Sequence, residues 1–276
     1  MDTALLLQVF LSFSIGGIVV TLLALLAERA HENLAGIIMM FPTTIVLGFF
    51  FLGWTTSVQT IANVIPATIT PLGIVIFSSV IYIYTARFLE HYITSKQQHI
   101  LATFFLSSVV WFLLVMPFAW WKFQSVIVGS FGYVFFTTIS HFILHHKAPK
   151  TNIQQHQYSF LQVLIRAVFT GAVIAIVVIL GKILNPFWAG IFTMYPAVTF
   201  ASLIIFHYYY STAQLFHFMK KVPLGSISLY AYTIAAMQLF PSYGLWLGSL
   251  GAYLIALSVS FLLVLILKLS KDKHPS

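Results

Sequence analysis

The chain has 276 residues, of which 60% are hydrophobic and only 7% are charged, and its formal net charge is +8. Soluble domains carry about 25% charged residues, so this composition excludes a soluble protein and indicates an integral membrane protein. The chain has no cysteine, which excludes disulfides, thiolate metal sites and cysteine nucleophiles. A basic excess in such a chain is typical of topology signals beside membrane spans, rather than of anionic ligands.

Apolar runs follow one another along the whole chain. Roughly 20 apolar residues are needed to cross about 30 Å of hydrocarbon. On this measure we expect nine transmembrane helices, at about Ala4–Ala27, Leu34–Trp54, Pro66–Tyr92, Ile100–Ala119, Phe123–Leu144, Ser159–Leu184, Phe187–Tyr210, Pro223–Phe240 and Leu245–Leu269. The stretches Val58–Thr70 and Ser211–Lys221 are each either a short interfacial helix or an extension of the next span. The expected fold class is an all-α integral membrane protein.

The basic residues fix an orientation for these spans. With nine spans, eleven of the thirteen lysines and arginines fall on one side of the membrane, and only Lys122 and Lys182 fall on the other. Because positive residues concentrate on the cytoplasmic side, we expect an external N-terminus and a cytoplasmic C-terminus. An aromatic belt is expected at the external interface, formed by Trp54, Trp120, Trp121, Trp188 and Trp246.

A gapless repeat relates the two halves of the chain. The segment 17–42 recurs 154 residues later as 171–196, where Ala35-Gly36-Ile37 and Pro42 become Ala189-Gly190-Ile191 and Pro196. The copies begin with spans of opposite direction, so the repeat is predicted to be inverted, as in many secondary transporters. We therefore predict a first membrane repeat at 1–121, a linker helix and cytoplasmic loop at 122–158, and a second membrane repeat at 159–276.

A family resemblance rests on residues of both copies. The second copy carries Lys182, Asn185, Ala189-Gly190 and Tyr195-Pro196, and the first carries Phe41-Pro42-Thr43. At this spacing each copy resembles the GlpM-like family of small bacterial inner-membrane proteins, here present as two tandem copies. The resemblance implies a multi-pass protein of the bacterial cytoplasmic (inner) membrane. The first copy departs from the pattern, because Glu28 and His31 stand where the second has Lys182 and Asn185.

The candidate substrate site lies where the two repeated prolines interrupt their spans. Proline removes a backbone hydrogen bond and breaks a helix, and in a bilayer the freed groups need other partners. One interpretation is that the broken spans cross and offer polar groups to a substrate, and the other is a packing kink with glycines allowing close approach. The candidate residues of this site are Gly36, Pro42, Thr43, Thr44, Gly190, Thr193, Tyr195 and Pro196.

Two cations complete the candidate set. Arg166 lies one to two turns inside its span, from where it either snorkels to the cytoplasmic headgroups or binds an anion. Lys182 faces the external end against the general trend. Among the histidines, His141 and His145 share a helical face, but no carboxylate or cysteine is near them in sequence, so no metal site is predicted.

The sequence favours transport over catalysis. It lacks paired acids, a nucleophile beside a base, and a phosphate-binding loop, so no enzyme activity and no cofactor are expected. The predicted function is a transporter or flippase for a small neutral, lipid-like or anionic substrate, because no acid lies deep in a span. The alternative is a non-catalytic membrane subunit that supports envelope or polysaccharide assembly. Expected partners are membrane lipids and the substrate, with no nucleic acid, and a homo-oligomer is compatible with the sequence.

Overall fold

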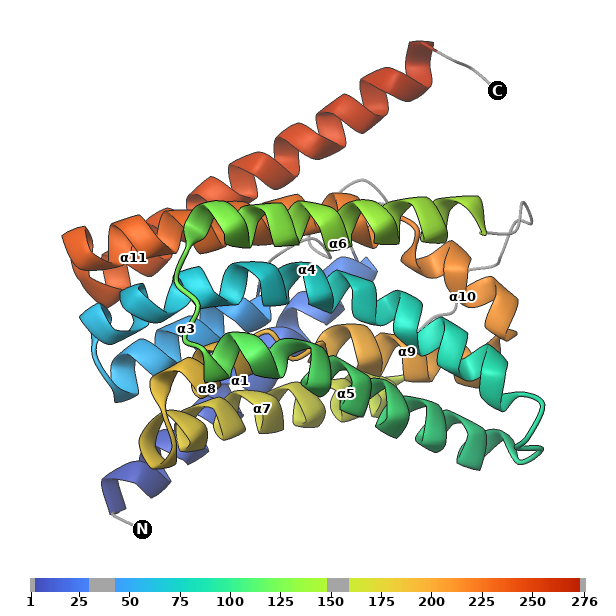
Figure 1. Ribbon diagram of the computed structural model, residues 1–276, viewed down its shortest axis with the longest axis horizontal. Helices are drawn as coiled ribbons and strands as arrows, with labels where there is room; N and C mark the ends of the chain where they lie inside the picture. The colour runs from blue at the N-terminus through green and yellow to red at the C-terminus, as the bar shows by residue number, and fades with distance from the viewer. Residues whose placement is uncertain (1–2, 30–42, 148–158, 274–276) are drawn as a thin grey trace.

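The computed structural model of the chain describes residues 3–29, 43–147 and 159–273, and these residues form helices and no strand. The helices are α1 (Thr3–Arg29), α3 (Thr43–Thr55), α4 (Val58–Leu89), α5 (Lys96–Trp120), α6 (Val126–His146), α7 (Phe160–Ile183), α8 (Pro186–Phe192), α9 (Ala197–Tyr209), α10 (Thr212–Met219) and α11 (Val222–Lys273). They form a bundle along the long axis of the molecule (Figure 1). The predicted all-α class is confirmed for this part of the chain.

The helices have the dimensions of membrane spans. Within the described residues, seven helices are long and apolar enough to cross a membrane, and α3 is a shorter apolar helix. α3 covers the second half of the predicted span Leu34–Trp54, whose first half lies outside the described residues. α11 contains the last two predicted spans, which are divided at Gly244, where φ is 73°. The protein is thus a multi-pass helical protein of membrane type.

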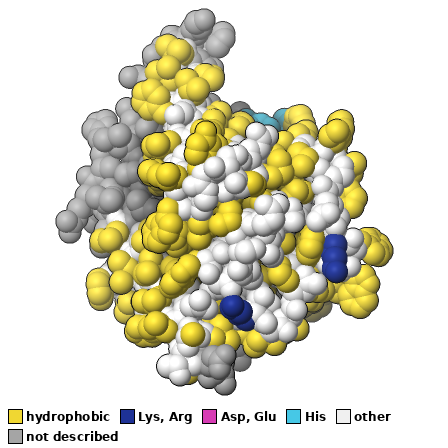
Figure 2. Space-filling view, turned by 90° about the vertical axis from the view of Figure 1, so that its left-hand side faces the viewer, with side chains coloured by type: hydrophobic (Ala, Val, Ile, Leu, Met, Phe, Trp, Pro, Cys, Tyr) yellow, Lys and Arg dark blue, Asp and Glu magenta, His cyan; other side chains and the backbone are white. Residues whose placement is uncertain are grey.

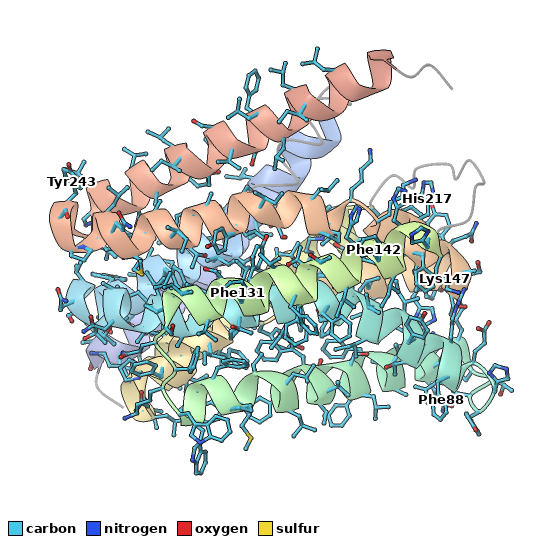
Figure 3. The ribbon with its side chains drawn as sticks, turned by 45° about the horizontal axis from the view of Figure 1, so that its top comes forward. Phe88, Phe131, Phe142, Lys147, His217 and Tyr243 are labelled. Carbon is cyan, nitrogen blue, oxygen red and sulfur yellow. The ribbon has the colours of Figure 1, made fainter. Side chains whose placement is uncertain are left out.

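Successive helices run back and forth between two ends of the bundle. Tyr243 lies at one end, whereas Phe88, Lys147 and His217 lie at the other (Figure 3). The chain starts at the Tyr243 end and finishes towards the opposite one (Figure 1). Seen end-on from the Tyr243 side, the surface is largely apolar, with scattered basic side chains and no acidic side chain in view (Figure 2).

Serine caps begin several of the helices. The Ser159 hydroxyl accepts a hydrogen bond from the backbone of Gln162, whose side chain accepts from the Ser159 N–H in return, and Ser211 begins α10 with Gln214 in the same role. Such caps satisfy backbone donors that a helix start leaves without partners. Ser211–Lys221 therefore contributes a separate short helix, α10, which is one of the two expected alternatives.

The equivalent stretch of the first half behaves differently. Val58–Thr70 is the beginning of α4, which continues without a break through Pro66 and Pro71. Of the two expected alternatives, the extension of the next span is therefore confirmed, and the helix begins about two turns before Pro66. Ser57 explains the earlier start, because its hydroxyl accepts from the backbone N–H of Thr60 at 3.0 Å and caps the helix.

α4 is the central helix of the bundle. It is buried along most of its length and packs against α5, α6, α8 and α11. Glycines allow α6 to approach it closely, since a Cβ on Gly73 would lie 2.8 Å from the Cα of Tyr133. Small residues permit such backbone approach in membranes, where packing drives helix association. α6, predicted as a linker between the repeats, also packs on α11, where the Tyr133 hydroxyl lies 2.8 Å from Ser226 Oγ.

The turn within α11 depends on Gly244. Its backbone (φ 73°, ψ −178°) lies in a region open to glycine alone, and a Cβ there would meet nothing within 4 Å. We expect Gly244→Ala to destabilise the protein by about 1–3 kcal/mol through backbone strain. The measurement is the midpoint of thermal unfolding in detergent. Ser242→Ala, in the same turn but exposed, is the control and should change it little.

Candidate substrate site at the broken helix

The span predicted at Phe187–Tyr210 is broken, as Pro196 indicated. α8 ends at Phe192, α9 begins at Ala197, and the residues between them form turns. The N–H groups of Met194 and Tyr195 donate to the carbonyls of Ile191 and Phe192, each at 2.9 Å. These tight turns satisfy backbone groups that a bilayer would leave without partners. The predicted break is therefore confirmed, and Tyr195 lies within it.

Small residues seat the broken helix in the bundle. A Cβ on Gly190 of α8 would lie 2.1 Å from Val64 Cγ1 of α4, so the two helices are in direct contact at this glycine. Thr193 is buried and lies against α3, where a Cβ on Gly48 would be 2.8 Å from Thr193 Cγ2. Gly190 and Thr193 thus pack against helices of the first half. This contact agrees with the interpretation in which the glycine allows close approach of helices.

The side chain of Tyr195 points to α5. Its hydroxyl lies 2.8 Å from Ser108 Oγ, and its ring lies edge-on to Trp111 with centroids 5.1 Å apart. Phe192 stacks on the same ring at 5.4 Å. The predicted site residue Tyr195 is therefore held by one hydrogen bond and an aromatic cage from α5 and α8.

A pocket of about 250 Å³ opens between α5 and this break. Its lining is almost entirely apolar and consists of Phe105, Ser108, Val109, Trp111, Phe112, Phe192 and Tyr195. The side of the pocket is formed by Phe105, which is 68% exposed on the flank of the bundle. Among the described residues the indole N–H of Trp111 has no hydrogen-bond acceptor. The pocket thus offers an apolar surface, and the Ser108 and Tyr195 hydroxyls in its wall are paired with each other.

The polar residues predicted from the first copy begin α3. Thr43 and Thr44 are half-buried, and Thr44 lies one turn before Gly48, the residue that packs on Thr193. α3 therefore does meet the broken helix, with glycine at the closest approach. Gly36 and Pro42 lie outside the described residues, as does the predicted crossing of Pro42 with Pro196.

The two candidate cations have different surroundings. Arg166 is 8% exposed and donates from Nη2 to Ser202 Oγ of α9 at 3.2 Å. The side chain thus packs between α7 and α9, and both interpretations of Arg166 stay predictions. Lys182 is exposed near the end of α7, and no described contact joins it to the pocket.

α1 and α7, which would be the first helices of the two predicted copies, contact each other at their glycines. A Cβ on Gly17 would lie 3.2 Å from the Ala167 carbonyl oxygen, and a Cβ on Gly171 would lie 2.6 Å from the Phe13 carbonyl oxygen. Adding the repeat offset of 154 to Gly17 and Phe13 gives Gly171 and Ala167. The predicted repeat would therefore exchange these two contacts, as a twofold axis exchanges the contacts across it.

Sequence reasoning missed the contribution of α5. Ser108 and Trp111 were assigned no role, and neither were two buried histidines, His99 of α5 and His207 of α9, whose ring centroids lie 4.7 Å apart. A signal was present, since His99, Thr103, Ser107 and Trp111 recur every four residues within an apolar run.

No metal centre accompanies these residues within the described part of the chain. It contains no group of three or more histidine, aspartate or glutamate side chains placed to hold an ion. His141 and His145 do stack on each other along α6, with ring centroids 5.6 Å apart.

Comparison with protein families, with curated proteins and with solved structures found no match to this chain.

Proposed function

We propose that the protein is a transporter or flippase with an inverted-repeat core, in which the pocket at the α8–α9 break receives the substrate. The observation that carries this proposal is the exchanged pair of contacts at Gly17 and Gly171. Residues 13 and 17 of α1 meet residues 171 and 167 of α7, so the two helices run antiparallel. A twofold axis in the membrane plane makes two equivalent helices antiparallel. An axis along the membrane normal would make them parallel.

The surroundings of the pocket favour a lipid-like substrate among the three expected classes. Its lining carries no charged side chain, and Phe105, Val109 and Phe112 are exposed on the flank of α5, in the middle of a membrane-length helix. An apolar chain could therefore enter sideways from the bilayer, with a hydroxyl or carbonyl group at Ser108 and Tyr195. An anion would find Arg166 engaged with Ser202.

The rest of the sequence-based prediction is retained as part of this proposal. The protein belongs to the bacterial inner membrane, with its N-terminus external and its C-terminus cytoplasmic, and it catalyses no reaction. The resemblance of each copy to the GlpM-like family supports that location. Membrane lipids are its surroundings, and a lipid-like molecule is its cargo.

Cysteine accessibility tests the proposal even while the substrate is unidentified. The chain has no cysteine, so each variant carries a single thiol. We expect Ser108→Cys and Tyr195→Cys in oriented membranes to react with a water-soluble maleimide added to either side. Reaction from both sides at one position is the signature of alternating access. Phe131→Cys, on the exposed face of α6 (Figure 3), should react from neither side, since it faces lipid.

Two results would contradict transport. If the pocket positions react from neither side, the pocket never opens to water, and the packing subunit becomes the better account. If they react from one side only, under all conditions, the site is a static cavity. Should labelling agree with alternating access, uptake of a fluorescent phospholipid by reconstituted vesicles identifies flipping directly.

A further inference from the structure

A buried pair of histidines joins the two halves of the chain. His99 of α5 and His207 of α9 are 7% and 3% exposed, and their rings meet edge to face, with 4.7 Å between centroids and 85° between planes. The Nε2–H of His99 donates to the Ala86 carbonyl of α4 at 2.7 Å. His207 Nδ1 lies 3.3 Å from the hydroxyl of Tyr82, also of α4. Both rings are thus held in place from α4.

Charged groups surround this pair at the end of the bundle that holds Phe88 and His217. Glu90 follows α4 and accepts a hydrogen bond from Thr212 of α10 at 2.9 Å. Lys96 Nζ, at the start of α5, lies 5.6 Å from the ring of Tyr208, the neighbour of His207. The titratable groups that act on His207 are Tyr82 of α4, Glu90 after α4, Lys96 of α5 and its partner His99.

The buried face of α5 continues from His99 as a row of polar side chains at four-residue spacing. Thr103, Ser107 and Trp111 are each at most 1% exposed, and in the described structure none of their polar side-chain atoms has a hydrogen-bond partner. Other buried hydroxyls of the bundle differ among themselves: some donate to their own helix, as Ser140 does to the Phe136 carbonyl at 2.7 Å, whereas others, such as Thr170, have no hydrogen-bond partner among the described residues. A buried polar group without a partner costs about 1–3 kcal/mol, and α5 is distinguished by carrying three of them in succession on one face, leading from His99 to the pocket residue Trp111.

We propose that His99 and His207 form a proton-binding site, and that the row Thr103–Ser107–Trp111 conducts water between this site and the pocket when the pair is protonated. This inference rests on the proposed function and supplies its coupling ion, a proton. Protonation moves a proton from hydronium in the bulk onto a ring nitrogen of the pair, which leaves one positive charge on the pair and releases a water molecule.

Charge explains why protonation would change the structure. A positive ring would be buried between α5 and α9, close to the ammonium of Lys96, while Glu90 is already engaged with Thr212. Burying a charge without a partner is costly, so a second arrangement, in which α5 and α9 separate and water reaches the ring, is favoured. The hydroxyls of the row then gain water as a partner, which offsets part of the cost.

The test measures water access to the row as a function of pH. Ser107→Cys and, separately, Thr103→Cys are made in the full chain in vesicles. Their reaction with a water-soluble methanethiosulfonate is followed from pH 8 to pH 4, a range that extends well below the ordinary histidine pKa because burial disfavours a charged ring. At each pH, the reaction rate of the cysteine variant is divided by the rate of the double variant that also carries His207→Gln. This ratio removes the effect of pH on the ionisation of the thiol itself. We expect the ratio to rise about tenfold on acidification. A tenfold rise corresponds to a difference of one pKa unit for the histidine pair between the closed arrangement and the arrangement in which α5 and α9 separate.

His91→Gln is the matched control. His91 lies at the same end of the bundle but is exposed, so its replacement should leave the pH dependence intact. The proposal is overturned if neither cysteine reacts at any pH, or if the ratio is flat, or if His91→Gln abolishes its change as His207→Gln does. The outcome is separate from that of the proposed function, because it needs no transport. If the cysteines of the row react in a pH-dependent way while the pocket positions react with maleimide from neither side, the proton site is supported and the transporter proposal is contradicted.

Discussion

Trp111→Ala should destabilise the protein by about 3–5 kcal/mol, the cost of removing a fully buried aromatic side chain. Trp111 is 1% exposed and contacts Tyr195 and Phe192, which belong to the other half of the chain. Its loss would leave a cavity beside the α8–α9 break and free the Tyr195 ring from its cage. The midpoint of thermal unfolding in detergent micelles, followed by circular dichroism, measures the effect.

The same helix supplies the control for this substitution. Trp120 is 67% exposed at the end of α5, so Trp120→Ala removes the same atoms without leaving a cavity, and its midpoint should stay close to that of the unmodified protein. Equal losses from the two variants would show that Trp111 does not join the halves. Trp111→Phe, which keeps a ring in the cage, should recover part of the stability that the alanine variant loses.

Gly171→Ala should separate α1 from α7 and destabilise the protein by about 1–3 kcal/mol, the usual cost of overpacking. The added Cβ would lie 2.6 Å from the carbonyl oxygen of Phe13, and because that atom belongs to the backbone of α1, a whole helix must move to accommodate it. The measurement is again the unfolding midpoint, together with labelling of a cysteine placed at Ser12, which is fully buried in the unmodified protein.

Gly16→Ala distinguishes close helix approach from the loss of a glycine as such. Its Cβ would also lie 2.6 Å from a neighbour, but that neighbour is Ile174 Cδ1, the end of a flexible side chain that can turn aside. The loss should therefore be smaller than for Gly171→Ala. A larger loss at Gly16 would contradict a crossing governed by the exchanged backbone contacts of Gly17 and Gly171.

Local features of the chain were predictable because the bilayer constrains each segment separately. A lipid-exposed span must satisfy its own backbone hydrogen bonds, so an apolar run of sufficient length forms a helix whatever surrounds it. α5, α6 and α7 accordingly begin and end within a few residues of their predicted bounds. The break before α9 was equally local, since Pro196 has no N–H to donate within a helix. At α4 the sequence left two alternatives, and the serine cap at Ser57 starts the helix upstream of Pro66, so the extended span forms.

The pairing of helices was not predictable in this way. Lipid tails are as apolar as leucine, so an apolar helix face carries no signal of whether it meets lipid or protein, and small residues and hydrogen bonds decide the contact. Arg166 reaches Ser202 because α7 packs on α9, and His99 meets His207 because α5 and α9 lie together beside α4. The residues that form the pocket with Tyr195 come largely from α5, 83 or more residues away along the chain. The membrane-type composition, the order of the described helices and the break before α9 follow from the sequence, whereas the partner of each helix, and with it the site, follows from the packing of the whole bundle.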